Sequence, residues 1–233
     1  MKMFEVDNGS WEAAYHFWFP SSLDKADLEG HRRMLAWWVM PDGAGRSVQR
    51  FSATVAAARA GQCDHWAREA AGRLALILAL AQFPRNLFAD SAEAYASDPA
   101  ALRLTLSGLD RGQFAELHKP WEKLFFLLPL AETEGPDHIE RIDRALRILQ
   151  SMVADVPLRI RPIYDCSIRH VEAMRDVIAR FGRFPHRNAA LGRATTEEEA
   201  TYLLNETLDH LSRPHRLPAG PKLHGNKSFA YEC

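Results

Sequence analysis

Apolar residues recur along most of this chain at the three- and four-residue spacing of an α-helix, and strand-like alternation hardly occurs. The strongest pattern follows Asp64, where apolar residues at 74, 77, 78 and 81 share one helical face. Residues 76 and 80 make the opposite face apolar as well. Because a helix that is apolar all round is buried on all sides, this pattern predicts a helix in the centre of the fold.

Capping residues and prolines indicate where the predicted helices begin and end. Ser21 and Asp24 have the spacing of a capping box, and Thr195 and Glu198 repeat that spacing before the last helix. A proline ends or kinks a helix, so the helix over 121–128 is expected to end before Pro129. The predicted helices cover residues 10–19, 21–38, 47–60, 64–81, 98–108, 121–128, 136–153, 168–181 and 195–211.

About nine helices joined by short links predict an all-α fold. Sequential helices with short loops tend to pack as antiparallel hairpins, so we expect a tetratricopeptide-like array of stacked hairpins. Residues 1–212 form a single domain in this interpretation. The tail at 213–233 is rich in Pro and Gly and has no helical period, so it is predicted to be loose or to pack as an extended strap.

One short motif occurs twice. QFPRNLF at 82–88 resembles RFPHRNAAL at 183–191, and both follow a long apolar helix. The chain is therefore expected to leave a helix at Phe-Pro twice and to present Arg and Asn each time. The second copy lies in the stretch 180–193, which carries four arginines and no acid. Guanidinium groups suit bidentate binding of carboxylate or phosphate, so these two corners form the candidate site.

Composition narrows the classes of function. The formal net charge is −1, whereas general nucleic-acid binders carry a strong basic excess, so nucleic acid is an improbable ligand. No CxxC pair occurs and the histidines lack metal-ligand spacing, so neither a metal nor a cofactor is indicated. The longest apolar run, 74–81, is too short to span a bilayer. These features predict a soluble cytoplasmic protein, and they give no oligomeric state.

Several segments together resemble one bacterial family. LALILALAQFPRNLF, SDPAAL, FFLLPLAETE and above all RFGRFPHRNAALGR are similar to the family catalogued as domain of unknown function 924. The resemblance implies a tetratricopeptide-like helical fold and no established activity, cofactor or substrate. The chain departs from the family pattern at two places. Ala81 stands where the family has Asp, and Glu132-Thr133-Glu134 stands where it has His-Ser-Glu.

Three functional hypotheses follow from these features. In the first, the two corners bind a small anionic molecule or a peptide carboxylate. In the second, the arginines pair with internal acids such as Asp98 and Glu132, and the protein is an interaction scaffold. In the third, the protein is a hydrolase acting on an anionic substrate, with no catalytic residue assigned. The candidate ligand-binding residues are Arg85, Asn86, Glu134, Arg183, His186, Arg187, Asn188 and Arg193.

Overall fold

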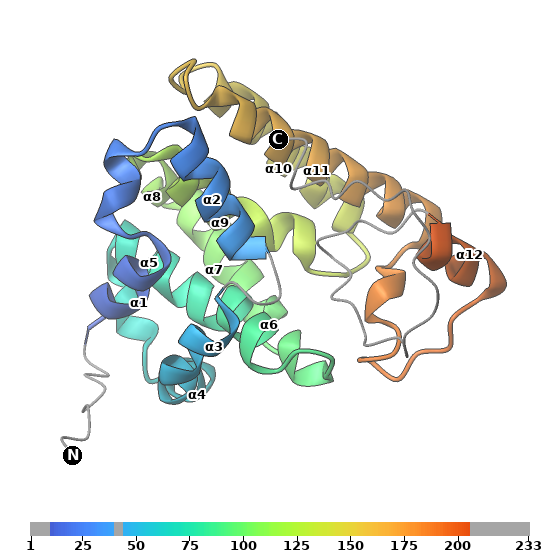
Figure 1. Ribbon diagram of the computed structural model, residues 1–233. Coiled ribbons are helices and arrows are strands. Elements are labelled where there is room, and N and C mark those ends of the chain that lie inside the picture. Colours follow the sequence, from blue (N-terminus) through green and yellow to red (C-terminus); the bar gives the residue numbers. More distant parts are fainter. Residues whose placement is uncertain (1–9, 40–43, 206–233) are drawn as a thin grey trace.

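The computed structural model describes residues 10–39 and 44–205, and every regular element in these ranges is helical (Figure 1). The predicted all-α class is confirmed. Nine of the twelve described α-helices have seven or more residues and correspond to the nine expected, and three helices of four or five residues were not predicted. The tail at 213–233 and the predicted helix end near 211 lie outside the described residues. The helices are α1 (Glu12–Trp18), α2 (Leu28–Val39), α3 (Gly45–Val48), α4 (Ser52–Arg59), α5 (Ala70–Ile77), α6 (Phe83–Leu87), α7 (Asp98–Asp110), α8 (Gln113–Glu116), α9 (Pro120–Glu132), α10 (His138–Val153), α11 (Arg161–Phe181) and α12 (Glu197–Asn205).

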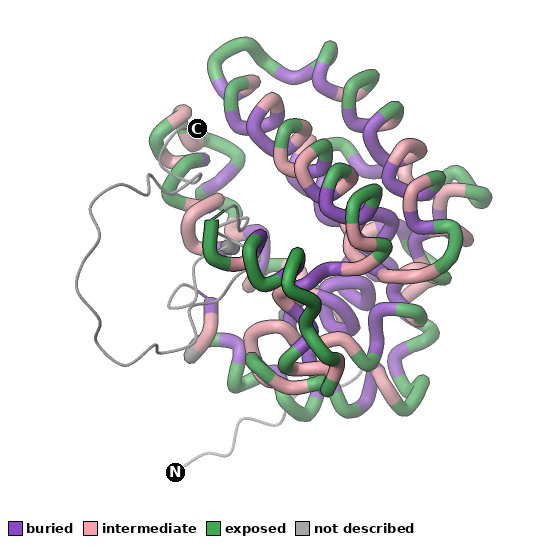
Figure 2. Tube along the Cα trace, turned by 90° about the vertical axis from the view of Figure 1, so that its right-hand side faces the viewer, coloured by how far each residue is buried: buried purple, intermediate pink, exposed green. Residues whose placement is uncertain are grey.

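The predicted central helix lies in the core, as expected. Every residue from Leu74 to Ala81 is buried, and the burial pattern is visible along the trace in Figure 2. Helix α9 lies between two buried clusters. Phe126 belongs to the cluster around α5, and Leu130 belongs to the cluster that α9 forms with α10 and α11. Because both sides of α9 are covered, its sequence is apolar around most of its circumference.

The first Phe-Pro corner is not a helix end, so that prediction was wrong. A π-helical turn, Leu78–Gln82, leads directly into α6. Pro84 lacks an N–H, and its ring would clash with a carbonyl of a regular α-helix, so the wider turn before it relieves both problems. Arg85 donates to the carbonyl of Ala81 at 2.6 Å, and Asn86 donates to that of Gln82 at 2.9 Å. The side chains of Arg85 and Asn86 therefore donate to backbone carbonyls of the turn that precedes them.

Pro129 does not end its helix either, contrary to the sequence prediction. Helix α9 continues through Pro129 to Glu132. A proline leaves carbonyls of the preceding turn without their usual N–H partner, and here the Thr105 hydroxyl donates to the carbonyl of Phe126 at 3.0 Å. Packing of α7 and a second core cluster on α9 thus keep the helix intact across the proline.

Two predicted capping boxes are displaced from their expected positions. Residues 21–25 form a 3-10 turn, and α2 is capped instead by Asp27, whose carboxylate accepts the N–H of Gly30 at 2.8 Å. The box of the last helix lies one residue later than predicted. Thr196 and Glu199 exchange hydrogen bonds of 2.8 and 3.2 Å, so Glu199 takes the place expected for Glu198.

Gly72 is predicted to be intolerant of any side chain. A Cβ atom at this position of α5 would lie 2.3 Å from the backbone oxygen of Trp66 and 3.0 Å from the ring of Trp11. We expect Gly72→Ala to lower the free energy of unfolding by about 1–3 kcal/mol or more. Gly45→Ala is the matched control, because Gly45 has no atom within 4 Å of the new methyl group. Urea unfolding of both variants tests the prediction, and equal stabilities would contradict this packing of α5.

Candidate functional site

The structure brings the two Phe-Pro corners together at the start of α7. Arg85, from α6, makes a bidentate pair with the carboxylate of Asp98, with distances of 2.8 and 2.9 Å. Arg187, from the 3-10 turn Pro185–Arg187, lies 3.6 Å from the same carboxylate. Both guanidinium groups also lie over the ring of Tyr95, at 5.5 and 4.5 Å from its centre. Asp98, one of the internal acids named as a possible partner of the arginines, thus joins the two corners.

Glu132 supplies a second carboxylate to this centre. Its side chain lies 3.2 Å from Arg85 and accepts a hydrogen bond of 3.0 Å from Gln82. Its backbone carbonyl accepts a bond of 2.8 Å from Arg187. Burial raises the pKa of Glu132, with Arg85 working against that shift. Burial alone would lower the pKa of Arg85, but Asp98 and Glu132 outweigh it and raise that pKa.

Arg183 pairs with the first turn of α12. It makes a bidentate pair with Glu199, with distances of 2.7 and 2.9 Å, and Asn188 donates to the same carboxylate at 3.1 Å. The hydrogen bonds from Arg183, followed by that from the backbone of Thr196, lower the pKa of Glu199 to about 2. One carboxylate therefore caps a helix and holds the arginine-rich segment against it.

Arg193 pairs with Glu134, which was predicted as a ligand-binding residue. The shorter of the two contacts is 2.5 Å, and the backbone N–H of Phe184 donates to Glu134 at 2.7 Å. Burial alone would raise the pKa of Glu134, but the hydrogen bonds from Arg193 and Phe184 lower it. Glu134 is thus an ionised acceptor that fastens the second corner to the end of α9.

Each predicted arginine therefore meets an internal carboxylate, and we call this arrangement the corner network. Asn86 binds its own helix, and His186 lies beside the ring of Phe184, 5.4 Å between centres. Of the four acids, Asp98 and Glu132 were expected as partners of the arginines, Glu134 was expected to bind a ligand, and Glu199 was not predicted. Glu199 lies three residues after Thr196, and this capping-box spacing is the feature of the sequence that could have identified it. The corner network consists of Arg85, Arg183, Arg187, Arg193, Asp98, Glu132, Glu134 and Glu199.

A buried histidine beside the corner network makes stability depend on pH. His138 is 1% exposed and contacts the carbonyl of Ala131 at 2.7 Å. Burial lowers its pKa to about 4, and the charges of Arg141 and Arg187 add to the effect. The unfolded chain, with its ordinary histidine pKa, binds more protons between pH 6.5 and pH 4, so stability falls as the pH falls through that window.

Because protonation of His138 favours the unfolded chain, we expect it to lower the free energy of unfolding by about 2–3 kcal/mol between pH 7 and pH 4. His138→Gln should flatten the slope of unfolding free energy against pH in that window, measured by urea unfolding. His118→Gln, which removes an exposed ring, should keep the wild-type slope. An unchanged slope in His138→Gln would show that the histidine is accessible to water.

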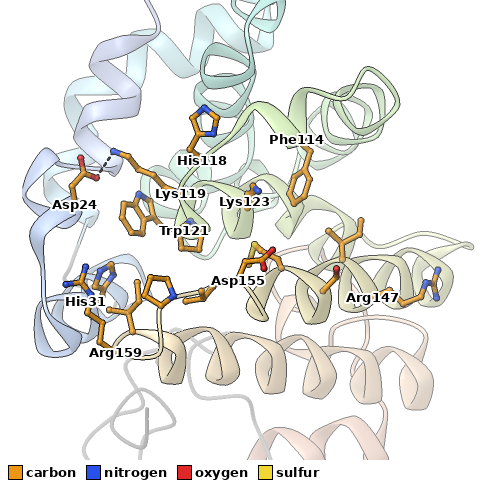
Figure 3. A pocket seen from close by; sticks show the side chains of 17 residues that line it. Asp24, His31, Phe114, His118, Lys119, Trp121, Lys123, Arg147, Asp155 and Arg159 are labelled. Atoms are coloured by element: carbon orange, nitrogen blue, oxygen red, sulfur yellow. Dashed lines mark ion pairs between the residues drawn. The ribbon is translucent and has the colours of Figure 1, made fainter.

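A groove of about 620 Å³ lies away from the corner network, between α2, the start of α9, the end of α10 and the link to α11 (Figure 3). Its apolar lining includes Trp121, Met152 and Ile160. No motif in the sequence indicates this groove, because its walls come from segments far apart in the chain. The residues that line it are Asp24, His31, Phe114, His118, Lys119, Pro120, Trp121, Lys123, Arg147, Ile148, Ser151, Met152, Asp155, Val156, Pro157, Arg159 and Ile160.

Residues 10–39 and 44–205 contain no group of three or more His, Cys, Asp or Glu side chains that is arranged to hold a metal ion. Over the described residues, none of the helices combines the length and apolar character needed to cross a membrane.

Fold and site together define an all-α protein with an internally paired arginine network and a separate surface groove. The chain belongs to the bacterial family of proteins of unknown function called DUF924, whose model matches residues 14–207, as its sequence motifs had suggested. It is similar to the solved structure of the protein of unknown function ATU0120 from Agrobacterium tumefaciens. That match has 33% identity and a TM-score of 0.65, and it covers 83% of this chain and 96% of the other. No curated protein matches the chain.

Proposed function

We propose that this protein is a helical interaction scaffold that holds a segment of another polypeptide in the groove between α2, α9 and α10. The observation that carries the proposal is the groove itself. Trp121 and Met152 line a hollow large enough to receive several apolar side chains. The corner network is then an internal brace, because its cations are already paired with carboxylates of the same chain.

The arrangement of consecutive helices is consistent with a tetratricopeptide-like scaffold. Helix α10 packs against both α9 and α11, as stacked hairpins do (Figure 1). Helical-hairpin arrays present extended concave surfaces, formed by several helices in a row, on which partners bind. We include this stacked-hairpin architecture in the proposal.

A displayed library of random peptides, selected on the full chain, tests the scaffold function. Selected peptides should bind the wild type in calorimetry. They should bind at least about tenfold more weakly to Ile148→Thr/Met152→Gln, which makes the groove lining polar at similar volume. Leu158→Gln is the control, because Leu158 is 76% exposed and does not line the groove. Failure to enrich any peptide, or binding that the groove variant does not weaken, would overturn the proposal.

A second candidate is the anion site expected from the sequence, and one observation favours it. Arg187 Nε and Asn188 Oδ1 are buried without a hydrogen-bond partner among the described residues, and the nearest carboxylate is 3.6 Å from Arg187. A carboxylate or phosphate ion that completes this centre would raise the Tm of the wild type saturably at constant ionic strength. Arg187→Lys should abolish the rise, and Arg33→Ala, an exposed control, should retain it.

The hydrolase hypothesis is not part of this proposal. Both acids of the Glu132-Thr133-Glu134 turn already interact with arginines, Glu132 with Arg85 and Glu134 with Arg193. A general base needs a lone pair directed at the substrate or at a water molecule. The contacts of these two carboxylates are directed into the protein.

A further inference from the structure

The groove carries positive charges that form no ion pair with a carboxylate of the described residues. Among the described residues, Lys123, Arg147 and Arg159 have no carboxylate within ion-pair distance. Lys119 is different, because it pairs with Asp24 at 2.5 Å. This contrasts with the corner network, in which every arginine meets an acid.

The charge balance of the groove favours an acidic partner. The lining contains four Lys and Arg side chains and two carboxylates, which leaves an excess of two positive charges when the histidines are neutral. In Figure 3, Arg159 and Arg147 lie toward opposite ends of the groove, and Asp155 lies between them. An acidic segment can therefore meet a cation at each end, while Asp155 disfavours a carboxylate at the middle.

The apolar lining lies on both walls of the groove. Ile148 and Met152 lie one turn apart on α10, and Phe114 and Trp121 lie on the other side, on α8 and α9. The ring of Trp121 lies 5.2 Å from that of His31 and 5.7 Å from the ammonium group of Lys119. Apolar side chains bordered by cations match a partner whose apolar face is bordered by acids.

We infer that the groove binds an amphipathic α-helix with acidic borders, contributed by another protein, an inference that rests on the proposed scaffold function. A helix satisfies its own backbone hydrogen bonds, which suits a lining made of side chains. Addition of an extended peptide to a sheet edge is not available here, because the described residues contain no strand. The partner's apolar face contacts Trp121 and Met152, and its Glu or Asp residues contact Arg147 and Lys123.

Three synthetic peptides of about four helical turns test this inference on the full chain. The first has Leu on one face and Glu along its borders. The second has Lys in place of Glu, and the third is a scrambled version of the first without an apolar face. Fluorescence anisotropy of labelled peptides should show that the acidic amphipathic peptide binds at least about tenfold more tightly than either of the others. Its affinity should fall as the salt concentration rises.

Charge reversal in the groove identifies the cations that recognise the peptide. Lys123→Glu/Arg147→Glu should weaken binding of the acidic peptide by about tenfold or more. Lys25→Glu/Arg68→Glu makes the same change in net charge at exposed positions outside the groove lining and should leave binding within about twofold. Equal weakening by both variants would mean attraction to the net charge alone and would overturn the inference.

The outcomes separate this inference from the scaffold function on which it rests. If acidic and basic amphipathic peptides bind equally and Ile148→Thr/Met152→Gln weakens both, the scaffold function stands and the acidic preference is wrong. If the library yields groove-binding peptides rich in Lys, Arg or Pro, the inference is also overturned. If no peptide of any kind binds in the groove, both proposals fail.

Discussion

Asp98→Asn should lower the free energy of unfolding by about 3–5 kcal/mol, because it removes the shared charge between two buried arginines. The side chain of Asp98 is 6% exposed, and those of Arg85 and Arg187 are 15% and 3% exposed. Asparagine has nearly the same shape, so the loss reports charge rather than volume. Urea unfolding monitored by circular dichroism gives the difference directly.

Glu29→Gln is the matched control for this substitution. It removes the acid of an exposed pair with Arg33, at 3.6 Å, in which the side chains are 61% and 70% exposed. Exposed pairs contribute about 0–1 kcal/mol, so the control should hardly change stability. If Asp98→Asn cost no more than Glu29→Gln, water would reach the two corners easily, and the corner network would be an open cationic site.

The sequence was sufficient for the class of fold and for most helices. The three- and four-residue spacing of apolar residues also marks the buried faces of α10 and α11, on which Ile142 and Met174 are fully buried. The general tendency of proline to end a helix gave wrong predictions at Pro84 and Pro129. A proline usually ends a helix, but tertiary packing and side-chain hydrogen bonds to the released carbonyls can compensate for it. Those compensating partners, such as Thr105, are distant in sequence.

The sequence indicated that the two corners belong together, but it left open whether their arginines meet a ligand or an internal acid. The repeated Phe-Pro motif correctly selected residues that meet in space, since Arg85 and Arg187 both contact Asp98. Whether an arginine meets a ligand or an internal acid depends on its burial and on where each carboxylate lies in space. The spacing of residues along the sequence gives neither. The groove could not be predicted from the sequence either, because residues that line it, such as Trp121 and Arg159, lie on separate elements.

Arg73 shows why a cluster of arginines is a weaker guide to structure than burial. It stands alone in an apolar segment, is 2% exposed, and has no carboxylate partner among the described residues. It donates to the carbonyls of Ala67 at 2.9 Å and Leu104 at 3.1 Å, to the hydroxyl of Ser107 at 2.7 Å, and to the side chain of Gln113. Burial lowers its pKa. One side chain thus joins α5 to α7, α8 and the segment before α5.

Arg73→Ala should therefore lower the free energy of unfolding by about 3–5 kcal/mol, since it leaves several buried acceptors without a donor and opens a cavity beside Gly108. Arg73→Lys keeps the charge but reaches fewer acceptors, so its loss should be smaller. Arg68→Ala, at an exposed position in the neighbouring turn, should stay within about 0.5 kcal/mol of the wild type. If Arg73→Ala behaved like Arg68→Ala in urea unfolding, water would replace the guanidinium group, and the junction of α5 with α7 would be open to solvent.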